Sequence, residues 1–275
     1  KNFSKEEKKQ IAQLVNEWQG KQIVFPENLT FTRYLTDTTD FQIPESDYKV
    51  LIYVDSIGCT SCKLQLHKWK ELIEYTDSAT QGKVPFLFFF HPKDAKEIRY
   101  LLKRDVFDRP VCIDIEDQLN KLNKFPSNIT FQTFLLDKNN KVVVLGNPVH
   151  NTAVKDLYLK QITGKDNPNK NIPKTTAEAT QTEIDFGTFG KSEVKETTIE
   201  VRNIGDNPLV IVDVSTTCGC TAATYDKRPA KPGETLRVGI KMTPKDSGFF
   251  DEVVTIKYNS INNQPVKAKI KGNVQ

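Results

Sequence analysis

The fold of this chain is decided by one stretch, Val50-Leu51-Ile52-Tyr53-Val54-Asp55-Ser56-Ile57-Gly58-Cys59-Thr60-Ser61-Cys62-Lys63-Leu64. Residues 50–54 form a continuous apolar run, which predicts a strand that is covered on both faces. Apolar residues then recur with helical spacing at Leu66, Trp69, Leu72 and Ile73. The motif Cys59-Thr60-Ser61-Cys62 is therefore expected at the junction between a strand and a helix.

This location suits thiol chemistry. A thiol is nucleophilic as the thiolate, and the free amide groups at a helix N-terminus favour the anion. The two intervening residues let Cys62 close a disulfide with Cys59, so we predict Cys59 as the exposed attacking thiol and Cys62 as the more buried resolving thiol. Half of a zinc site or a merely structural disulfide has the same spacing, and both alternatives stay open at this stage. His67, on the following helix, is expected to be solvated rather than a ligand.

Length, composition and charge are those of an ordinary globular protein. The chain has 275 residues, of which 37% are hydrophobic and 27% charged, and this length indicates two domains. Its 39 basic residues are scattered among 35 acidic ones, for a net charge of +4, which gives no argument for nucleic-acid binding. No apolar run approaches the about 20 residues of a membrane span.

Cysteine usage points to the compartment. Four of the five cysteines lie in two close pairs, which fits an oxidising or redox-handling compartment better than a reducing cytosol. The chain starts at Lys1 without methionine, which we interpret as a mature form from which a leader has been removed. We therefore expect an exported bacterial protein of the periplasm or the outer membrane, with a lipid anchor before Lys1 left open. Cys112 is expected to be a buried strand residue.

The flanking segments predict an α/β pattern. Residues 5–18 predict an amphipathic helix capped by Ser4, and residues 21–32 predict a strand pair or an extended arm, so that residues 1–44 pack on the next domain. Apolar runs at 85–90, 111–114 and 131–137 predict further strands, and a hairpin joins the last of these to 142–145. Helical patterns follow at 92–102, 115–122 and 154–162. This alternation predicts an α/β sandwich with a partly parallel sheet.

A family resemblance rests on the strand-loop-CxxC-helix, the strand Thr133-Phe134-Leu135-Leu136-Asp137 and the Gly146-Asn147-Pro148 that follows. Residues 45–164 resemble a thioredoxin-like domain of the extracytoplasmic thiol-disulfide oxidoreductase type. The resemblance implies exchange with protein thiols or disulfides and a redox partner protein, and no cofactor or metal is expected. Gly58 stands where that family usually carries an aromatic residue. Phe131 or Gln132 stands where it usually carries a cis-proline, so Phe131, Gln132 and Thr133 are expected either to wall a groove near Cys59 or to be ordinary strand residues.

The last third of the chain has a different character. Residues 165–180 are polar and contain prolines, which predicts an interdomain linker. From residue 181 onward, six short alternating strands are separated by turns, which predicts a β-sandwich over 181–275. Four motifs occur in this part, namely Asp185-Phe186-Gly187, Asn203-Ile204-Gly205, Cys218-Gly219-Cys220-Thr221 and Lys231-Pro232-Gly233-Glu234. On these motifs, the part resembles a bacterial immunoglobulin-like family of unknown function that occurs on exported proteins.

The motif Cys218-Gly219-Cys220 has three interpretations. Cysteines separated by one residue close a disulfide only in a tight ring, and strained disulfides are easily reduced. Cys218 and Cys220 are therefore candidates for a second redox pair. They are also candidates for half of a soft-metal site, for copper(I) or zinc. The third interpretation is one or both thiols packed or oxidised at a strand end.

Taken together, the sequence predicts two domains, an α/β thioredoxin-like fold followed by an all-β immunoglobulin-like sandwich. It favours a cell-envelope thiol-disulfide oxidoreductase-like protein that acts on protein substrates through Cys59 and Cys62. The alternative is a non-catalytic binding or scaffold protein with a degenerate thioredoxin-like domain and an adhesive β-sandwich.

Overall fold

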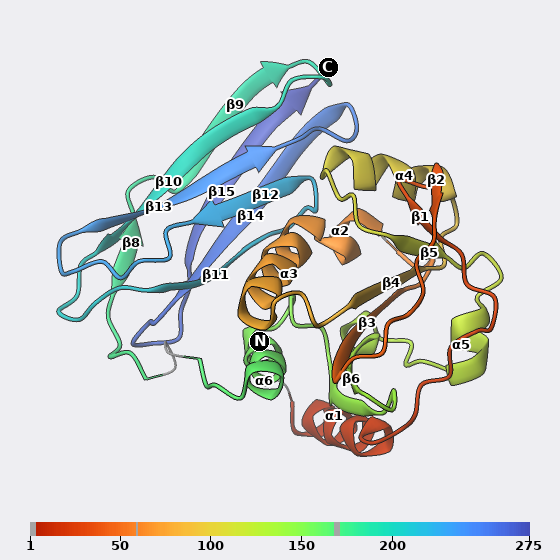
Figure 1. The fold of residues 1–275 in the computed structure, drawn as a ribbon. Helices are drawn as coiled ribbons and strands as arrows, with labels where there is room; N and C mark the ends of the chain where they lie inside the picture. Colours follow the sequence, from red (N-terminus) through yellow and green to blue (C-terminus); the bar gives the residue numbers. More distant parts are fainter. Residues whose placement is uncertain (1–3, 59, 168–170) are drawn as a thin grey trace. The chain divides into compact units, whose positions relative to one another are not determined.

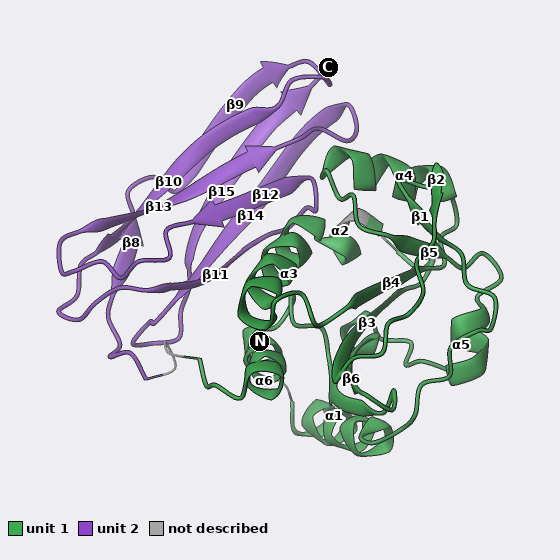
Figure 2. Ribbon diagram, in the orientation of Figure 1, with its two compact units in different colours: residues 1–167 green, residues 168–275 purple. Residues whose placement is uncertain are grey.

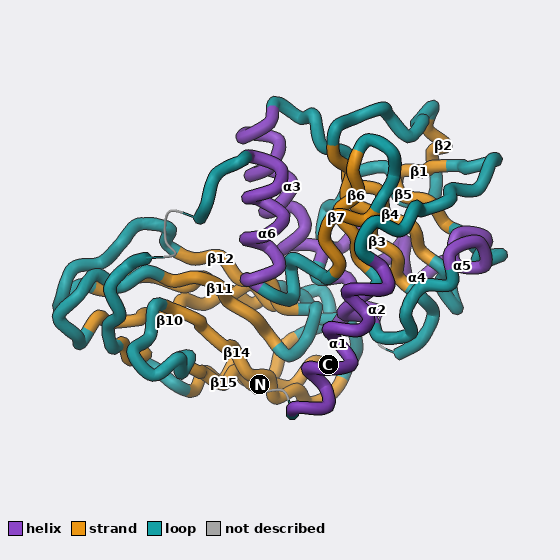
Figure 3. Tube along the Cα trace, turned by 90° about the horizontal axis from the view of Figure 1, so that it is seen from below, coloured by secondary structure: helices purple, strands orange, loops and turns teal. Residues whose placement is uncertain are grey.

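The computed structural model describes residues 4–58, 60–167 and 171–275, and contacts divide the chain into two compact units. Unit 1 comprises residues 1–167 and unit 2 comprises residues 168–275 (Figure 2). Unit 1 combines helices with one mixed sheet, whereas the described part of unit 2 consists of strands and loops (Figures 1 and 3). Within the described ranges, no helix has both the length and the apolar composition needed to span a bilayer.

The sheet of unit 1 has seven strands in the order β2-β1-β5-β4-β3-β6-β7. Their bounds are β1 (Phe31–Arg33), β2 (Asp37–Thr39), β3 (Tyr48–Val54), β4 (Phe86–Phe90), β5 (Val111–Ile113), β6 (Thr133–Asp137) and β7 (Val142–Leu145). Strands β3, β4 and β5 are parallel neighbours, and the other adjacent pairs are antiparallel. The partly parallel sheet expected from the sequence is therefore present.

Two apolar clusters cover the two faces of this sheet. Val50, Ile52 and Val54 of β3 pack in one cluster, whereas Leu51 and Tyr53 pack in the other. The first cluster includes residues of α3 (Leu66–Thr80), α4 (Ala95–Arg104) and α6 (Thr152–Thr163), and the second includes residues of α1 (Lys5–Trp18) and α5 (Gln118–Asn123). The five side chains of residues 50–54 in β3 are at most 5% exposed, which explains why this run has no polar face.

Helix α1 begins and ends as its sequence predicts. The Ser4 hydroxyl accepts a hydrogen bond from the Glu7 amide at 3.1 Å, and the Glu7 carboxylate accepts one from the Ser4 amide at 2.7 Å. This reciprocal pair satisfies two amide groups that have no partner inside the helix. At the other end of α1, Trp18 is buried in the second cluster. The N-terminal helix is thus part of the core of unit 1.

Two local predictions for unit 1 are wrong in detail, and for residues 21–26 the extended arm is the alternative that the structure contains. The helix after the cysteines forms two pieces, α2 (Thr60–Leu64) and α3, because Gln65 between them adopts a left-handed backbone conformation with φ of 40°. The predicted strand over 131–137 begins only at Thr133, since Ile129–Phe131 form the 3-10 turn η1. In the arm, Lys21 to Pro26 form no regular strand pair, and Gln22 makes a single bridge to Lys141.

Unit 2 contains two four-stranded sheets, with the orders β12-β13-β10-β8 and β11-β14-β15-β9. The strands are β8 (Ala177–Ala179), β9 (Glu183–Phe189), β10 (Lys195–Asn203), β11 (Ile211–Thr216), β12 (Thr221–Tyr225), β13 (Thr235–Met242), β14 (Gly248–Tyr258) and β15 (Val266–Val274). One apolar cluster contains Ile199 and Val238 from the first sheet and Val254 and Ile270 from the second. The two sheets therefore pack face to face around a common core.

Two elements of unit 2 differ from the sequence prediction. The predicted linker over 165–180 is too long, because Ala177–Ala179 form strand β8 and pair with residues 201–203 of β10. The strand β12 directly after Cys220 is absent from the prediction, and it pairs with β13 over its whole length. Both segments are rich in alanine, which has a low intrinsic preference for strands, so the neighbouring strands determine their conformation.

Candidate functional site

The first candidate site lies between β3 and α2. Cys59 is outside the described residues, and Cys62 is a partly buried residue of α2. Helix α2 follows the loop at the end of the central strand β3, as the sequence predicts for the CxxC motif. Gly58 has a φ of 77°, a left-handed conformation that glycine adopts without a steric penalty. This conformation gives a local reason for glycine at the position before the first cysteine.

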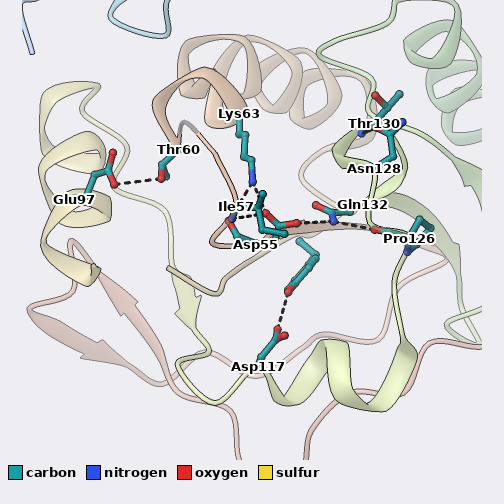
Figure 4. A network of polar contacts seen from close by, with 11 residues as sticks. Asp55, Ile57, Thr60, Lys63, Glu97, Asp117, Pro126, Asn128, Thr130 and Gln132 are labelled. Atoms are coloured by element: carbon teal, nitrogen blue, oxygen red, sulfur yellow. Dashed lines mark hydrogen bonds and ion pairs between the residues drawn. The ribbon is translucent and has the colours of Figure 1, made fainter. Parts of the chain in front are cut away.

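A polar network connects this loop to α2 and to the start of β6. Figure 4 shows three donors that converge on the carboxylate of Asp55. The ammonium of Lys63 pairs with Oδ1, the amide of Ile57 donates to Oδ1 at 2.9 Å, and Nε2 of Gln132 donates to Oδ2 at 2.9 Å. Burial alone would raise the pKa of Asp55, but the hydrogen bonds from Lys63, Gln132 and Ile57 together hold it below its ordinary value. Asp55 is therefore ionised at neutral pH and stabilises the connection between β3 and α2.

The three residues predicted to lie beside the cysteines have different surroundings. Gln132 is 2% exposed, and its Nε2 also donates to the carbonyl of Pro126 at 2.9 Å. Phe131 packs on the apolar cluster of the opposite face of the sheet, and Thr133 is buried at the start of β6. Gln132 thus contacts the residue that follows β3, whereas Phe131 is a packing residue.

His67 is more buried than the sequence predicts. It lies on α3, and burial lowers the pKa of its imidazole to about 4. The positive charge of Lys68 contributes to the same shift. His67 is therefore only partly exposed, because it lies on the partly covered side of the helix. The imidazole is neutral at physiological pH.

Cys112 is expected to be chemically inert in the native protein. It is 4% exposed in β5, and burial, with a further contribution from Asp114, raises the pKa of its thiol to about 12. Because the thiolate is the reactive form, we expect no alkylation of Cys112 by iodoacetamide at about pH 8 in the native chain, and full alkylation after denaturation. Mass spectrometry of the peptide that contains Cys112 measures this. Native labelling at the rate of an exposed thiol would contradict the burial.

The second candidate site lies in unit 2, at the turn before β12. Cys218 and Cys220 form a disulfide with a Cα–Cα distance of 5.2 Å, so the oxidised alternative is the one the structure contains. Sγ of Cys220 lies 3.1 Å from Oε1 of Glu252, and the Thr221 hydroxyl donates to Oε2 of Glu252 at 2.8 Å. Glu252 is 5% exposed, and burial raises the pKa of its carboxyl in spite of the Thr221 hydrogen bond, which lowers it.

This cluster is also the one group among the described residues that has the composition of a metal site. The sulfurs of Cys218 and Cys220 and a carboxylate oxygen of Glu252 lie within 4.8 Å of one another. Thiolates bind soft ions, but the sulfurs become thiolates only after the disulfide is reduced. In the oxidised state the group is therefore not a ligand set for an ion.

Glu252 is the site residue that the sequence analysis missed. It occupies the inward-facing register of β14 together with the apolar residues Val254 and Ile256. A carboxyl group in the apolar register of a strand is unusual, because burial of an uncompensated charge is costly. This break in the alternating pattern is the signal that would have identified the residue.

Comparison with known proteins gives one family match. Residues 177–274 match the family described as a protein of unknown function (DUF1573), so the match covers most of unit 2 and none of unit 1. No curated protein matches the chain. The family description carries no activity.

Several solved structures are similar to parts of the chain. A protein of unknown function from Porphyromonas gingivalis W83 has 23% identity and a TM-score of 0.34, and the match covers 37% of this chain and 48% of that one. This chain therefore spans about half the length of that protein. The C-terminal domain of an uncharacterized protein from Bacteroides fragilis has 19% identity and a TM-score of 0.36, with 50% and 94% covered. Peroxiredoxin Q of Xanthomonas campestris has 15% identity and a TM-score of 0.37, with 50% and 90% covered.

Proposed function

We propose that this chain is a cell-envelope thiol-disulfide oxidoreductase-like protein, with a thioredoxin-like domain at residues 45–164 and an immunoglobulin-like sandwich at 181–275. The observation that carries the proposal is the position of Cys62 on α2, at the end of the buried central strand β3. The parallel pair β3–β4 with antiparallel β6 and β7 at its side supports the fold assignment for unit 1. The face-to-face sheets of the described part support the assignment for unit 2.

The proposed reaction is thiol-disulfide exchange with a protein substrate. The Cys59 thiolate attacks one sulfur of a substrate disulfide, forms a mixed disulfide and displaces a substrate thiolate. The Cys62 thiolate then attacks the sulfur of Cys59 and displaces the second substrate thiolate. The substrate disulfide gains two electrons, which the cysteine pair loses on forming its own disulfide. A redox partner protein that carries a reduced dithiol restores the pair.

The compartment and the partners belong to the same proposal. The proposed compartment rests on cysteine usage, since four of the five cysteines lie in two close pairs, as is common where disulfides persist. We therefore propose a periplasmic or outer-membrane-associated protein whose partners are protein thiols or disulfides.

Reduction of insulin by the full chain tests the proposal. We expect a cysteine-dependent rate that falls in Cys59→Ser, because this variant lacks the attacking thiol. Any rate that remains above background in Cys59→Ser and is lost when Cys218 is also replaced with serine belongs to the second cysteine pair. In Cys62→Ser the mixed disulfide is not resolved, so covalent adducts between the protein and its substrate accumulate on a non-reducing gel. Cys112→Ser is the control and is expected to keep the rate of the wild type. An equal rate in the wild type and in Cys59→Ser would refute the proposed reaction.

One observation favours the alternative of a binding or scaffold protein. Gln132, directly before Thr133, stands near the position where the thioredoxin-like family usually carries a proline. Its side-chain amide donates a hydrogen bond to Asp55. Under this alternative, replacement of both Cys59 and Cys62 with serine leaves capture of a partner protein unchanged. A loss of capture in that double variant separates the exchange function from the scaffold function.

A further inference from the structure

We propose that Cys218 and Cys220 are a second redox centre, in which Glu252 exchanges a proton with Cys220 while the disulfide opens and closes. This centre lies in unit 2 and does not depend on the function proposed for Cys59 and Cys62. Its substrate class is a dithiol, which reduces the pair, or a disulfide, which the reduced pair reduces in turn.

The contact between Cys220 and Glu252 identifies the proton. Both sulfurs are engaged in the disulfide, so Cys220 carries no S–H group. A hydrogen bond between its Sγ and Oε1 of Glu252, 3.1 Å apart, therefore requires the proton on the carboxyl group. Burial favours this neutral form of Glu252, since an unpaired buried carboxylate is costly. The oxidised centre thus holds a proton beside the sulfur that becomes a thiolate when the disulfide opens.

The two sulfurs are not equivalent. Cys220 is 8% exposed, whereas Cys218 is less buried, so an incoming thiolate has better access to Cys218. The backbone amide of Cys220 lies 3.1 Å from Sγ of Cys218 and donates toward it. This donor stabilises a thiolate on Cys218 in the reduced state, because a hydrogen bond to the charged form favours that form. Cys218 is therefore the outward-facing nucleophile, and Cys220 is the resolving thiol.

A dithiol reduces the cysteine pair in two successive exchanges. One thiolate of the dithiol attacks Sγ of Cys218, the bond between Cys218 and Cys220 breaks, and its electron pair goes to Sγ of Cys220. Glu252 transfers its proton to that sulfur. The second thiolate of the dithiol then attacks the dithiol sulfur that is bound to Sγ of Cys218. This step releases Cys218 as a thiolate and leaves the dithiol oxidised to a disulfide. Glu252 regains a proton from solvent, and the reverse sequence oxidises the pair.

The surroundings of the cysteines keep this geometry fixed. The Thr216 hydroxyl lies 2.8 Å from the carbonyl of Cys218 and 3.0 Å from that of Thr221. The amide of Thr243 donates to the carbonyl of Cys220 at 3.0 Å. On the neighbouring strand, the amide of Val253, the residue after Glu252, donates to the hydroxyl of Thr217 at 3.0 Å. These bonds hold the cysteine turn in place while the disulfide is closed.

The titration of Glu252 depends on few neighbours. From the turn and β12, the groups facing it are the sulfurs of Cys218 and Cys220 and the hydroxyl of Thr221. Its register partner on β15 is the apolar Ile270. The charged neighbours on β14 and β15 are exposed or half-exposed residues that pair with one another or with β9, namely Asp251, Lys269 and Lys271. Burial accordingly raises the pKa of Glu252, and the hydrogen bond from the Thr221 hydroxyl opposes this rise.

The test follows reduction of Cys218–Cys220 by dithiothreitol in the full chain. Cys59 and Cys62 are both replaced with serine, so that their chemistry does not contribute. The reaction is quenched at a series of times, and the fraction of Cys218 and Cys220 that is then alkylated is measured by mass spectrometry. The second-order rate constant is then expressed per dithiothreitol thiolate at each pH. We expect this constant to fall as the pH rises through the raised pKa of Glu252, because the proton donor is lost and a buried negative charge appears beside the leaving sulfur.

Two variants distinguish proton transfer from a structural role. Glu252→Gln keeps the size and the hydrogen bonding but has no acidic proton, so we expect a constant about 10²-fold lower at acidic pH, without the fall at higher pH. Thr221→Val removes a hydrogen bond that lowers the pKa of Glu252, so the midpoint of the fall is expected to move to higher pH. Asp251→Asn, on the same strand with an exposed side chain, is the control and is expected to match the parent.

Three results would overturn the proposal. The first is a rate constant in Glu252→Gln with the magnitude and pH dependence of the parent. The second is an unchanged midpoint in a folded Thr221→Val variant. The third is alkylation of both cysteines without any reductant after treatment with a mild oxidant, which would mean that the disulfide does not form. Circular dichroism of each variant checks its folding.

Discussion

Replacement of Trp18 with alanine is expected to lower the free energy of unfolding of unit 1 by about 3–5 kcal/mol. Trp18 is the last residue of α1 and is 1% exposed. Its ring centroid lies 5.9 Å from that of Phe125 and 5.2 Å from that of Phe134. Removal of the indole would leave a cavity between α1 and the sheet, and both the lost burial and the cavity are unfavourable. The large effect follows because Trp18 is the buried residue of α1, whereas Leu14 and Val15 pack on the same cluster only in part.

The two tryptophans of the chain make the measurement specific. Both lie in unit 1, and Trp69 remains as the only tryptophan in the Trp18→Ala variant. Its fluorescence during denaturant unfolding of the full chain therefore reports on unit 1. Tyr75→Ala is the control, since Tyr75 is 55% exposed and its loss should change the free energy of unfolding by less than about 0.5 kcal/mol. A loss of under about 1 kcal/mol in Trp18→Ala would mean that α1 does not pack as described.

The sequence predicts most accurately the elements that local patterns determine. The continuous apolar run at 50–54 predicts a strand covered on both sides, and β3 lies in the middle of the sheet. The capping residue Ser4 and the spacing of apolar residues predict α1 over the range it occupies. These elements are predictable because their signals lie within one turn or one strand of the chain.

The sequence predicts less well the features that depend on distant partners. The amide of Gln132 binds Asp55 across 77 residues, and neither residue carries a local signal for this contact. The pair formed by Cys220 and Glu252 is separated by 32 residues and requires the two sheets to be assembled. The break between α2 and α3 occurs at Gln65, a residue that is ordinary in a helix interior. In the first two cases contacts between distant residues add to the local preference, and no contact among the described residues explains the break at Gln65.

Asp55→Ala is expected to destabilise unit 1 by about 3 kcal/mol, the lower end of the range for breaking a largely buried ion pair. The side chains of Asp55 and Lys63 are 13% and 12% exposed, so the loss of the carboxylate leaves the ammonium with little access to water. The amide of Ile57 loses its acceptor as well. Lys63→Met is expected to cost less, about 1–2 kcal/mol, because Asp55 keeps the hydrogen bonds from Ile57 and Gln132. Denaturant unfolding followed by tryptophan fluorescence measures both variants.

The double variant separates the energy of the ion pair between Asp55 and Lys63 from the other effects of the two substitutions. Asp55→Ala together with Lys63→Met should be less destabilised than the sum of the two single variants, by about 0.5–3 kcal/mol, because neither charge is left unpaired. Additive losses would contradict a direct pairing.

The sign of the pH dependence follows from the lowered pKa of Asp55. The ordinary pKa of an aspartate is about 3.9, and Asp55 titrates below it in the folded protein. Its stabilising contribution is therefore fully present above about pH 4 and is lost as the pH falls through the folded value. The stability difference between the wild type and Asp55→Asn should stay constant around neutral pH and shrink only in acid. A difference that already shrinks between about pH 7 and pH 5 would mean that burial dominates, that the pKa of Asp55 is raised, and that Asp55 carries a proton near the cysteine loop at working pH.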